Sequence, residues 1–249
     1  TDVEIGPYAV IGAHVEIGAG TTVGAHAVIG GHTTIGRDNR IFQFASIGAA
    51  PQDKKYAGEP TRLEIGDRNT IREFCTFNLG TVQDAGVTRL GNDNWMMAYV
   101  HLAHDCQIGN HTIFANNSQL AGHVHVDDHA ILGGFTAVHQ FCRIGAHAFI
   151  GGLSGVENDV IPYGIAIGNR AHLAGLNIVG LKRRGFSREV IHDIRRAYRL
   201  LFAEEGTLQE RIEDVAADFG TDHTVVEILD FLRAAGSRSV CTPRDANNV

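Results

Sequence analysis

Hydrophobic residues recur at every sixth position over most of the chain. One run of this pattern starts at Ile5 and ends at Ile47, and another starts at Leu90 and ends at Val156. Neither the helical period of about 3.6 residues nor the two-residue alternation of a strand explains this spacing. A sustained period of six is typical of hexapeptide β-helices. The sequence therefore predicts short strands joined by corners, with about three hexads in each coil.

The positions four residues after these hydrophobic residues are small in most hexads, and we predict that they also point into the core. Cys75, Cys106 and Cys142 occupy such positions. We therefore interpret them as small core residues and not as redox or metal-binding thiols. Glycine follows most hydrophobic positions of the first run, and we expect it to allow the corner conformation.

The period becomes helical from about residue 187. Ser187 is a candidate N-cap for a first helix, and Thr207 with Glu210 has the spacing of a capping box for a second. A third helix is predicted to end at Gly236. These helices would cover the last coil of the β-helix, whose strand edges are otherwise exposed.

The two patterns divide the chain into a predicted β-helix over residues 1–170 and a predicted α-helical cap over residues 171–249. The β-helix pattern is interrupted at about residues 49–64 and 79–89. Irregular loops on a rigid scaffold often carry binding and catalytic residues.

The register predicts where these interruptions open. The first leaves a gap of 18 residues, so we expect Ile65 to lie on the same face as Ile47, and the second adds one residue to the register. On this count the same face also carries Leu102, Leu120 and Val138. Both interruptions are thus expected to open near one side of the prism.

The stretch HLAHDC, residues 101–106, brings two imidazoles, a carboxylate and a thiol to that side. Residues 18 apart are expected to stack, which places His104 beneath Gly122 and Asp105 beneath His123. Imidazole titrates near neutral pH and a carboxylate can fix its tautomer, so His104 with Asp105 is the best general-base candidate. The backbone N–H of Gly122 is a candidate oxyanion-hole donor.

A structural role and a metal site are the competing interpretations of such histidines. Histidines also stack at His111, His129 and His147, and we interpret that group as solvated surface structure. Zinc is an alternative at residues 101–106, but it needs three imidazoles that converge at about 2.0–2.1 Å, and no position imposes this convergence. We therefore predict no metal.

Composition narrows the class of protein. The net charge of −7 and the pI of about 6.0 argue against general nucleic-acid affinity. No apolar run approaches the roughly 18–20 residues of a membrane span, no secretory signal precedes the first glycine-rich repeat, and the four cysteines lack CxxC spacing. We therefore expect a cytoplasmic protein. The sequence opens in register at Thr1 without a Met, so we expect that the natural start is missing.

The segments HLAHDC, LAGHVHVDDHAILGG, TAVHQF and GLKRRGFSRE resemble the UDP-N-acetylglucosamine O-acyltransferase family, which starts lipid A synthesis. The resemblance covers nearly the whole chain. It implies a left-handed β-helix and a homotrimer with active sites between neighbouring prisms. It further implies transfer of a 3-hydroxyacyl chain from acyl carrier protein to the 3-position of UDP-N-acetylglucosamine, without a cofactor.

The resemblance also assigns roles. His104 matches the general base, Asp105 its supporting acid and Gly122 the oxyanion amide. Gly152 matches the position that limits acyl length, and glycine there leaves room for a long chain. Further substrate contacts, of which the last three match the nucleotide and phosphate end, are Gln52, Asp53, Lys55, Asn78, His101, His123, His139, Gln140, Asn177, Arg183 and Arg184.

Two positions depart from the family pattern. Asn78 stands where the family commonly has His, and Val179 stands where some relatives carry Glu. An amide changes what the pocket can donate or accept at the 3-position of the sugar. The 3-amino analogue of the sugar nucleotide is therefore a second candidate acceptor. An acetyltransferase that uses acetyl-CoA, a zinc hydratase and a non-catalytic scaffold are the competing functions for a hexapeptide β-helix with these residues.

A basic cluster lies between residues 182 and 199, although the chain as a whole is acidic. It fits docking of the acidic acyl carrier protein by charge complementarity, and a solvated helix face is the alternative. Its members are Lys182, Arg183, Arg184, Arg188, Arg195, Arg196 and Arg199.

Overall fold

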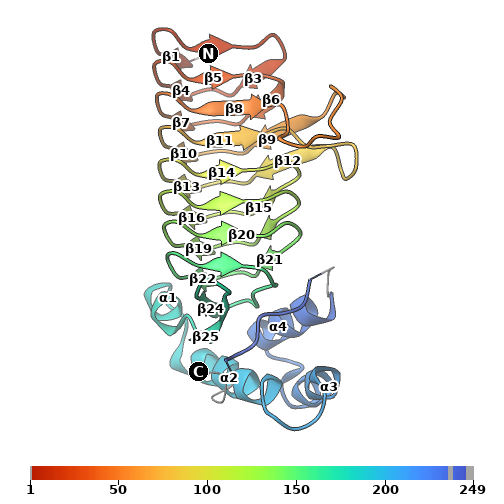
Figure 1. The fold of residues 1–249 in the computed structure, drawn as a ribbon. Coiled ribbons are helices and arrows are strands. Elements are labelled where there is room, and N and C mark those ends of the chain that lie inside the picture. Colours follow the sequence, from red (N-terminus) through yellow and green to blue (C-terminus); the bar gives the residue numbers. More distant parts are fainter. Residues whose placement is uncertain (1, 235–237, 245–249) are drawn as a thin grey trace.

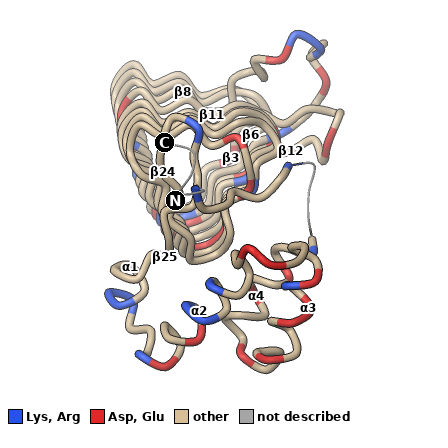
Figure 2. Tube along the Cα trace, turned by 60° about the horizontal axis from the view of Figure 1, so that its bottom comes forward, with Lys and Arg blue, Asp and Glu red and all other residues tan. Residues whose placement is uncertain are grey.

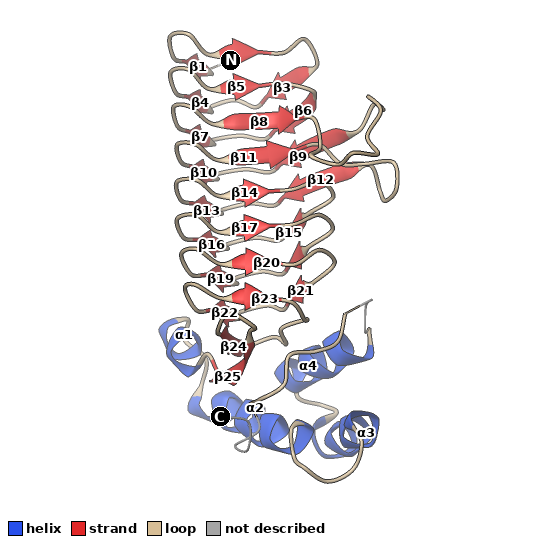
Figure 3. Ribbon diagram, in the orientation of Figure 1, coloured by secondary structure: helices blue, strands red, loops and turns tan. Residues whose placement is uncertain are grey.

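The computed structural model describes residues 2–234 and 238–244. Over these residues the chain forms a three-sided prism of stacked coils, followed by helices (Figures 1 and 3). The near strands in Figure 1 run to the right while the chain descends, so the coils wind left-handed. The left-handed β-helix with a C-terminal helical region is therefore confirmed. Among the described residues, no helix has the length and apolar character to cross a bilayer.

Strands from successive coils pair in parallel to give one sheet on each side of the prism, and an antiparallel strand ends the first sheet. The first sheet contains β1 (Glu4–Ile5), β4 (Thr22–Val23), β7 (Arg40–Ile41), β10 (Thr70–Ile71), β13 (Trp95–Met96), β16 (Ile113–Phe114), β19 (Ile131–Leu132), β22 (Phe149–Ile150), β24 (Gly164–Ile167) and β25 (His172–Leu176). The second contains β2 (Val10–Ile11), β5 (Val28–Ile29), β8 (Ser46–Ala49), β11 (Thr76–Asn78), β14 (His101–Leu102), β17 (Gln119–Leu120), β20 (Ala137–Val138) and β23 (Gly155–Val156). The third contains β3 (Val15–Ile17), β6 (His32–Ile35), β9 (Arg62–Ile65), β12 (Val87–Leu90), β15 (Gln107–Ile108), β18 (His125–Val126) and β21 (Arg143–Ile144).

The core follows the predicted period. Leu102 pairs with Leu120 in the second sheet, and both side chains are fully buried. Cys75, Cys106 and Cys142 are also fully buried, as predicted. Burial raises the pKa of each of these thiols to about 12, so they stay protonated in the physiological range.

The predicted reason for the glycines holds for Gly48 (φ 77°) but is wrong for the other glycines that follow the hydrophobic positions of the first run. Gly6 does not have a positive φ; instead, a Cβ there would lie 2.7 Å from the backbone nitrogen of Ala25 in the next coil. Glycine at this position allows coils to stack closely. The left-handed conformation falls two residues later on other residue types, such as Phe44 (φ 61°) and His123 (φ 62°).

The two loops span residues 50–61 and 79–86, and both are shorter than predicted because β9 and β12 extend into a ladder of four residue pairs. The expectation that Ile65 shares a face with Ile47 is wrong, since Ile65 lies in the third sheet. The first loop takes the place of two hexads, so the chain advances by one face only. The second loop also joins one face to the next, so the chain again advances by one face only. The register errors made at the two loops cancel, and Leu102 does lie on the face of Ile47.

The helical region contains α1 (Ile178–Arg183), α2 (Arg188–Leu201), α3 (Leu208–Phe219) and α4 (His223–Arg233). Ser187 caps α2, and Thr207 with Glu210 forms the predicted capping box of α3. The short helix α1 was not predicted. The predicted end of the last helix, Gly236, lies outside the described residues. The division of the chain at residues 170 and 171 stays a prediction.

Candidate active site

The two loops and the HLAHDC stretch meet at one corner of the prism. Each loop joins the second sheet to the third, and His104 follows β14 at the same corner. The parallel pairing of β14 with β17 and of β17 with β20 stacks His104, Gly122 and Gln140 in successive coils. We call this edge, marked by those three residues, the cleft corner.

Three residues of the cleft corner have left-handed backbone: Asp105 (φ 61°), His123 (φ 62°) and Phe141 (φ 65°). This conformation is unfavourable for residues with a side chain, and it persists here because ladder hydrogen bonds hold each turn in place. The N–H of His123 donates to the carbonyl of His104, and the N–H of Phe141 donates to the carbonyl of Gly122. The site is therefore built on rigid corners.

The carboxylate of Asp105 is buried behind His104 and fully satisfied. Nδ1 of His104 lies 2.9 Å from Oδ2 of Asp105. The backbone N–H of Thr81 donates to Oδ1 at 2.9 Å, and the Thr81 hydroxyl donates to Oδ2 at 2.6 Å. Burial alone would raise the pKa of Asp105, but the hydrogen bonds from His104 and Thr81 outweigh it and hold the pKa below its usual range. An ionised Asp105 accepts from Nδ1, so His104 keeps Nε2 as the free, basic nitrogen.

Gly122 lies directly against the His104 ring. A Cβ at Gly122 would lie 2.7 Å from Nε2 and 3.0 Å from Nδ1 of His104, which leaves room for glycine alone. Among the backbone hydrogen bonds of the described residues, none uses the Gly122 N–H as donor. The predicted proximity of the His104 ring and the Gly122 backbone is therefore confirmed, and their catalytic roles stay predictions.

A cleft of about 810 Å³ opens at this corner. Its floor carries His104 and His123, and the 50–61 and 79–86 loops form its rim. The lining residues are Gln52, Asp53, Lys54, Lys55, Gln83, Asp84, His104, His123, Gln140 and Phe141. Six of the predicted site residues thus meet in one cleft, and Lys54, Gln83, Asp84 and Phe141 were not singled out from the sequence.

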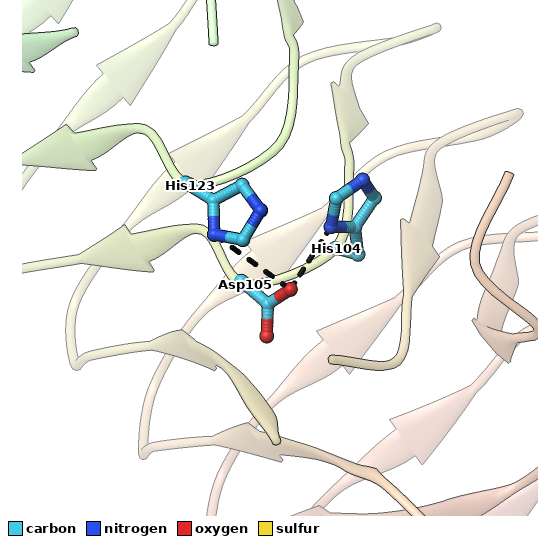
Figure 4. A group of neighbouring side chains, drawn as sticks. All are labelled: His104, Asp105 and His123. Carbon is cyan, nitrogen blue, oxygen red and sulfur yellow. Dashed lines mark hydrogen bonds and ion pairs between the residues drawn. The ribbon is translucent and has the colours of Figure 1, made fainter. Parts of the chain in front are cut away.

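His104, Asp105 and His123 lie close enough together to suggest a metal site, and Figure 4 shows both Nδ1 atoms turned toward the carboxylate. Both Nδ1 atoms and Oδ2 of Asp105 are already engaged in hydrogen bonds, however. Asp105 Oδ2 accepts from Thr81 and His104, while Nδ1 of His123 lies 2.8 Å from Asp84 and 3.8 Å from Asp105. These contacts are those of hydrogen-bonded pairs, and the absence of a metal stays a prediction.

Three predicted substrate contacts lie near the cleft but outside its lining. His101, in β14, shares a hydrogen bond of 2.7 Å with the Thr76 hydroxyl, and burial lowers its pKa. His139 lies 2.7 Å from the Arg238 guanidinium. Asn78 is buried at the end of β11, and its side-chain oxygen has no hydrogen-bond partner among the described residues.

The remaining predicted contacts lie on different edges of the same chain. Gly152 packs against the backbone of Gly134 at the corner between the first and second sheets. Asn177 caps α1 and donates to the carbonyl of His147, and Arg184 donates to the carbonyl of His129. The chain by itself does not bring these residues, or the exposed Arg183, to the cleft corner.

The interpretation of the His111, His129 and His147 group as solvated structure is wrong for His147. Its ring stacks between His129 and Tyr163, with Phe186 at its edge. Burial lowers its pKa to about 4, and the Arg184 cation adds to the effect. His147 is therefore a neutral, packed residue at neutral pH.

A left-handed β-helix of hexapeptide repeats, with a histidine–carboxylate pair against a bare backbone N–H, defines the class of hexapeptide-repeat transferases. Comparison with known proteins agrees. Residues 159–241 match the family model described as "Udp N-acetylglucosamine O-acyltransferase; Domain 2", and residues 1–31 and 88–122 match the bacterial transferase hexapeptide model.

Among relatives, the acyl-[acyl-carrier-protein]–UDP-N-acetylglucosamine O-acyltransferase of Herminiimonas arsenicoxydans is 65% identical over 84% of this chain and 80% of its own. The protein of the same name from Thiobacillus denitrificans is 63% identical over 94% of this chain and 91% of its own. The solved UDP-N-acetylglucosamine acyltransferase of Francisella novicida superposes with a TM-score of 0.93 at 40% identity, covering 99% of this chain and 91% of that one. LpxA from Acinetobacter baumannii superposes with a TM-score of 0.94 at 46% identity, covering 96% of this chain and 93% of that one. This chain belongs to the UDP-N-acetylglucosamine O-acyltransferase family.

Proposed function

We propose that this protein transfers a 3-hydroxyacyl chain from acyl carrier protein to the 3-hydroxyl of UDP-N-acetylglucosamine, the first step of lipid A synthesis. The single observation that supports this most is the contact of the His104 ring with Gly122, with the Asp105 carboxylate behind the ring. The names of the relatives support the donor, the acceptor and the O-acyl product.

The geometry suits general-base attack on a thioester. Nε2 of His104 takes the proton of the sugar hydroxyl while the hydroxyl oxygen bonds to the thioester carbon. The carbonyl oxygen becomes an oxyanion, which accepts a hydrogen bond from the Gly122 N–H. Collapse breaks the carbon–sulfur bond, and the departing thiolate takes the proton back from His104. Asp105 stabilises the imidazolium that exists between the two proton transfers.

The relatives' names favour the ester product over the N-acyl product of the 3-amino analogue, and acyl carrier protein over acetyl-CoA. Mass spectrometry of the product formed from UDP-N-acetylglucosamine and a series of acyl-carrier thioesters tests this. A product increased in mass by one 3-hydroxyacyl group, and labile to mild base as an ester is, supports the proposal. If no acyl-carrier thioester of any chain length gave a product and acetyl-CoA was turned over instead, the acetyltransferase alternative would replace this proposal.

We also propose that the protein acts as a homotrimer. The corner between the first and second sheets carries exposed apolar side chains in most coils, interrupted by His26 and Asn117. Exposed apolar surface gathered in this way marks an interaction surface. These side chains are those of Tyr8, Phe44, Phe74, Tyr99, Phe135 and Leu153. A neighbouring prism could also bring Asn177, Arg183 and Arg184 to the cleft of the first. Light scattering on the purified protein tests the trimer.

A cytoplasmic location is part of the proposal. Cys75, Cys106, Cys142 and Cys241 are all free and buried, which suits a reducing compartment. Cell fractionation tests the location.

A further inference from the structure

The cleft contains a second histidine–carboxylate pair, formed by His123 and Asp84. Nδ1 of His123 lies 2.8 Å from Oδ2 of Asp84, which belongs to the 79–86 loop. The His123 ring stacks on Phe141 at 4.4 Å with the planes 7° apart, so its plane is fixed from the other side. The ring of His104 meets it edge-on, with the centroids 5.0 Å apart.

This arrangement decides which carboxylate each imidazole uses. His123 Nδ1 lies only 3.8 Å from Oδ2 of Asp105, the same oxygen that accepts from His104. An imidazole Nδ1–H can donate one hydrogen bond, and Asp84, at 2.8 Å, accepts it. Without Asp84, the nearest carboxylate for this donor would be Asp105.

Competition for Asp105 would disturb His104. Oδ2 of Asp105 already accepts from the Thr81 hydroxyl at 2.6 Å and from His104 at 2.9 Å. A third donor at that oxygen would have to displace one of them, and His104 is the less tightly held of the two. A displaced His104 would no longer have its tautomer fixed.

We propose that Asp84 is a positioning residue that holds the Nδ1 proton of His123 away from Asp105 and so keeps Asp105 for His104. The inference rests on the proposed acyl transfer. It also gives His123 a defined tautomer: with Nδ1–H donated to Asp84, Nε2 is a lone-pair acceptor at the cleft. His123 thus offers the substrate an acceptor for a hydroxyl or amide N–H.

The test is Asp84→Asn in the full chain, with steady-state acyl transfer as readout. An amide can donate as well as accept, so it no longer selects one nitrogen of His123, and we expect kcat/KM to fall about tenfold. Asp84→Glu restores a carboxylate and should retain most of the activity. Val82→Ala is the matched control, because Val82 is exposed in the same loop and does not line the cleft. Asp84 is itself exposed, so Tm should not change in any of the three variants.

A double variant isolates the route of the effect. His123→Phe keeps a ring against Phe141 and removes both ring nitrogens. In that background Asp84→Asn should have no further effect, since no competing donor remains. Equal kcat/KM for Asp84→Asn and Val82→Ala would overturn the inference, and so would a failure of Asp84→Glu to exceed Asp84→Asn. An inactive wild-type protein would instead refute the proposed function.

Discussion

The His104 imidazole lies on the backbone of Gly122, at a position where any side chain at residue 122 would overlap the ring. His104 offers Nε2, and Gly122 offers an N–H that donates no backbone hydrogen bond among the described residues. The coil spacing fixes the distance between them. Two residues stacked in adjacent coils thus place an imidazole beside a backbone N–H, as the proposed acyl transfer requires.

Gly122→Ala should abolish most activity without unfolding the protein. The new Cβ would force the His104 ring away from Asp105 and crowd the oxyanion position, and we expect kcat to fall by about 10²–10³-fold. Ala121→Gly is the control, because it alters the neighbouring residue without adding atoms near the ring. Turnover of Gly122→Ala within about threefold of wild type would show that this contact does not matter for the reaction.

Thr81→Val should weaken the site through Asp105. The variant loses the hydroxyl that donates to Oδ2 at 2.6 Å but keeps the backbone N–H donor to Oδ1. The pKa of Asp105 should rise, because one of the bonds that lowers it is gone. Stability from this carboxylate is present above its unfolded pKa and is lost as the pH falls through the folded pKa, so Thr81→Val should lose that stability at a higher pH than wild type. Acid unfolding followed by circular dichroism measures this shift; coincident curves would contradict it.

His147 should make folding stability depend on pH. Its folded pKa of about 4 lies below the ordinary histidine value of 6.5, so the unfolded chain binds the proton more readily. The contribution of neutral His147 is present above pH 6.5 and is lost as the pH falls toward 4. His147→Phe keeps a ring in the stack and removes this titration. The variant should lose less Tm than wild type on acidification from neutral pH to about pH 5; an equal loss would show that His147 is not the responsible group.

The basic cluster should affect binding of the acyl carrier protein and should not affect binding of the acyl group itself. Figure 2 shows Lys and Arg on α1 and α2, and Arg195 and Arg199 line a hollow of about 450 Å³ beside Leu176 and Ile178. Reversing both charges, Arg195→Glu with Arg199→Glu, should raise KM for acyl carrier protein about tenfold, and the wild-type advantage should shrink with added salt. A small acyl thioester without the protein carrier is the control donor. Equal losses with both donors would argue against docking at this surface.

The hexapeptide repeat and the proximity of His104 to Gly122 could be predicted from the sequence because both depend on residue spacing alone. The 18-residue stacking of His104 and Gly122 needs no knowledge of the loops between them. The loops have no such period, so Thr81 and Asp84 could not be placed against Asp105 and His123 before the structure was known. The error over Ile65 has the same origin, since an excursion and a full coil of equal length look alike in sequence. Gly152 and the other predicted contacts on different edges would reach the cleft only in the proposed trimer, and the hexad spacing within one chain carries no signal for such an assembly.

The role of His104 as general base is the central claim, and single-turnover acyl transfer by His104→Ala tests it most directly. The account predicts a rate about 10²–10⁴-fold below wild type, with the oligomeric state and Tm unchanged. His111→Ala, which removes an exposed imidazole from another edge of the prism, should transfer at the wild-type rate. A His104→Ala rate close to that of His111→Ala would contradict the account.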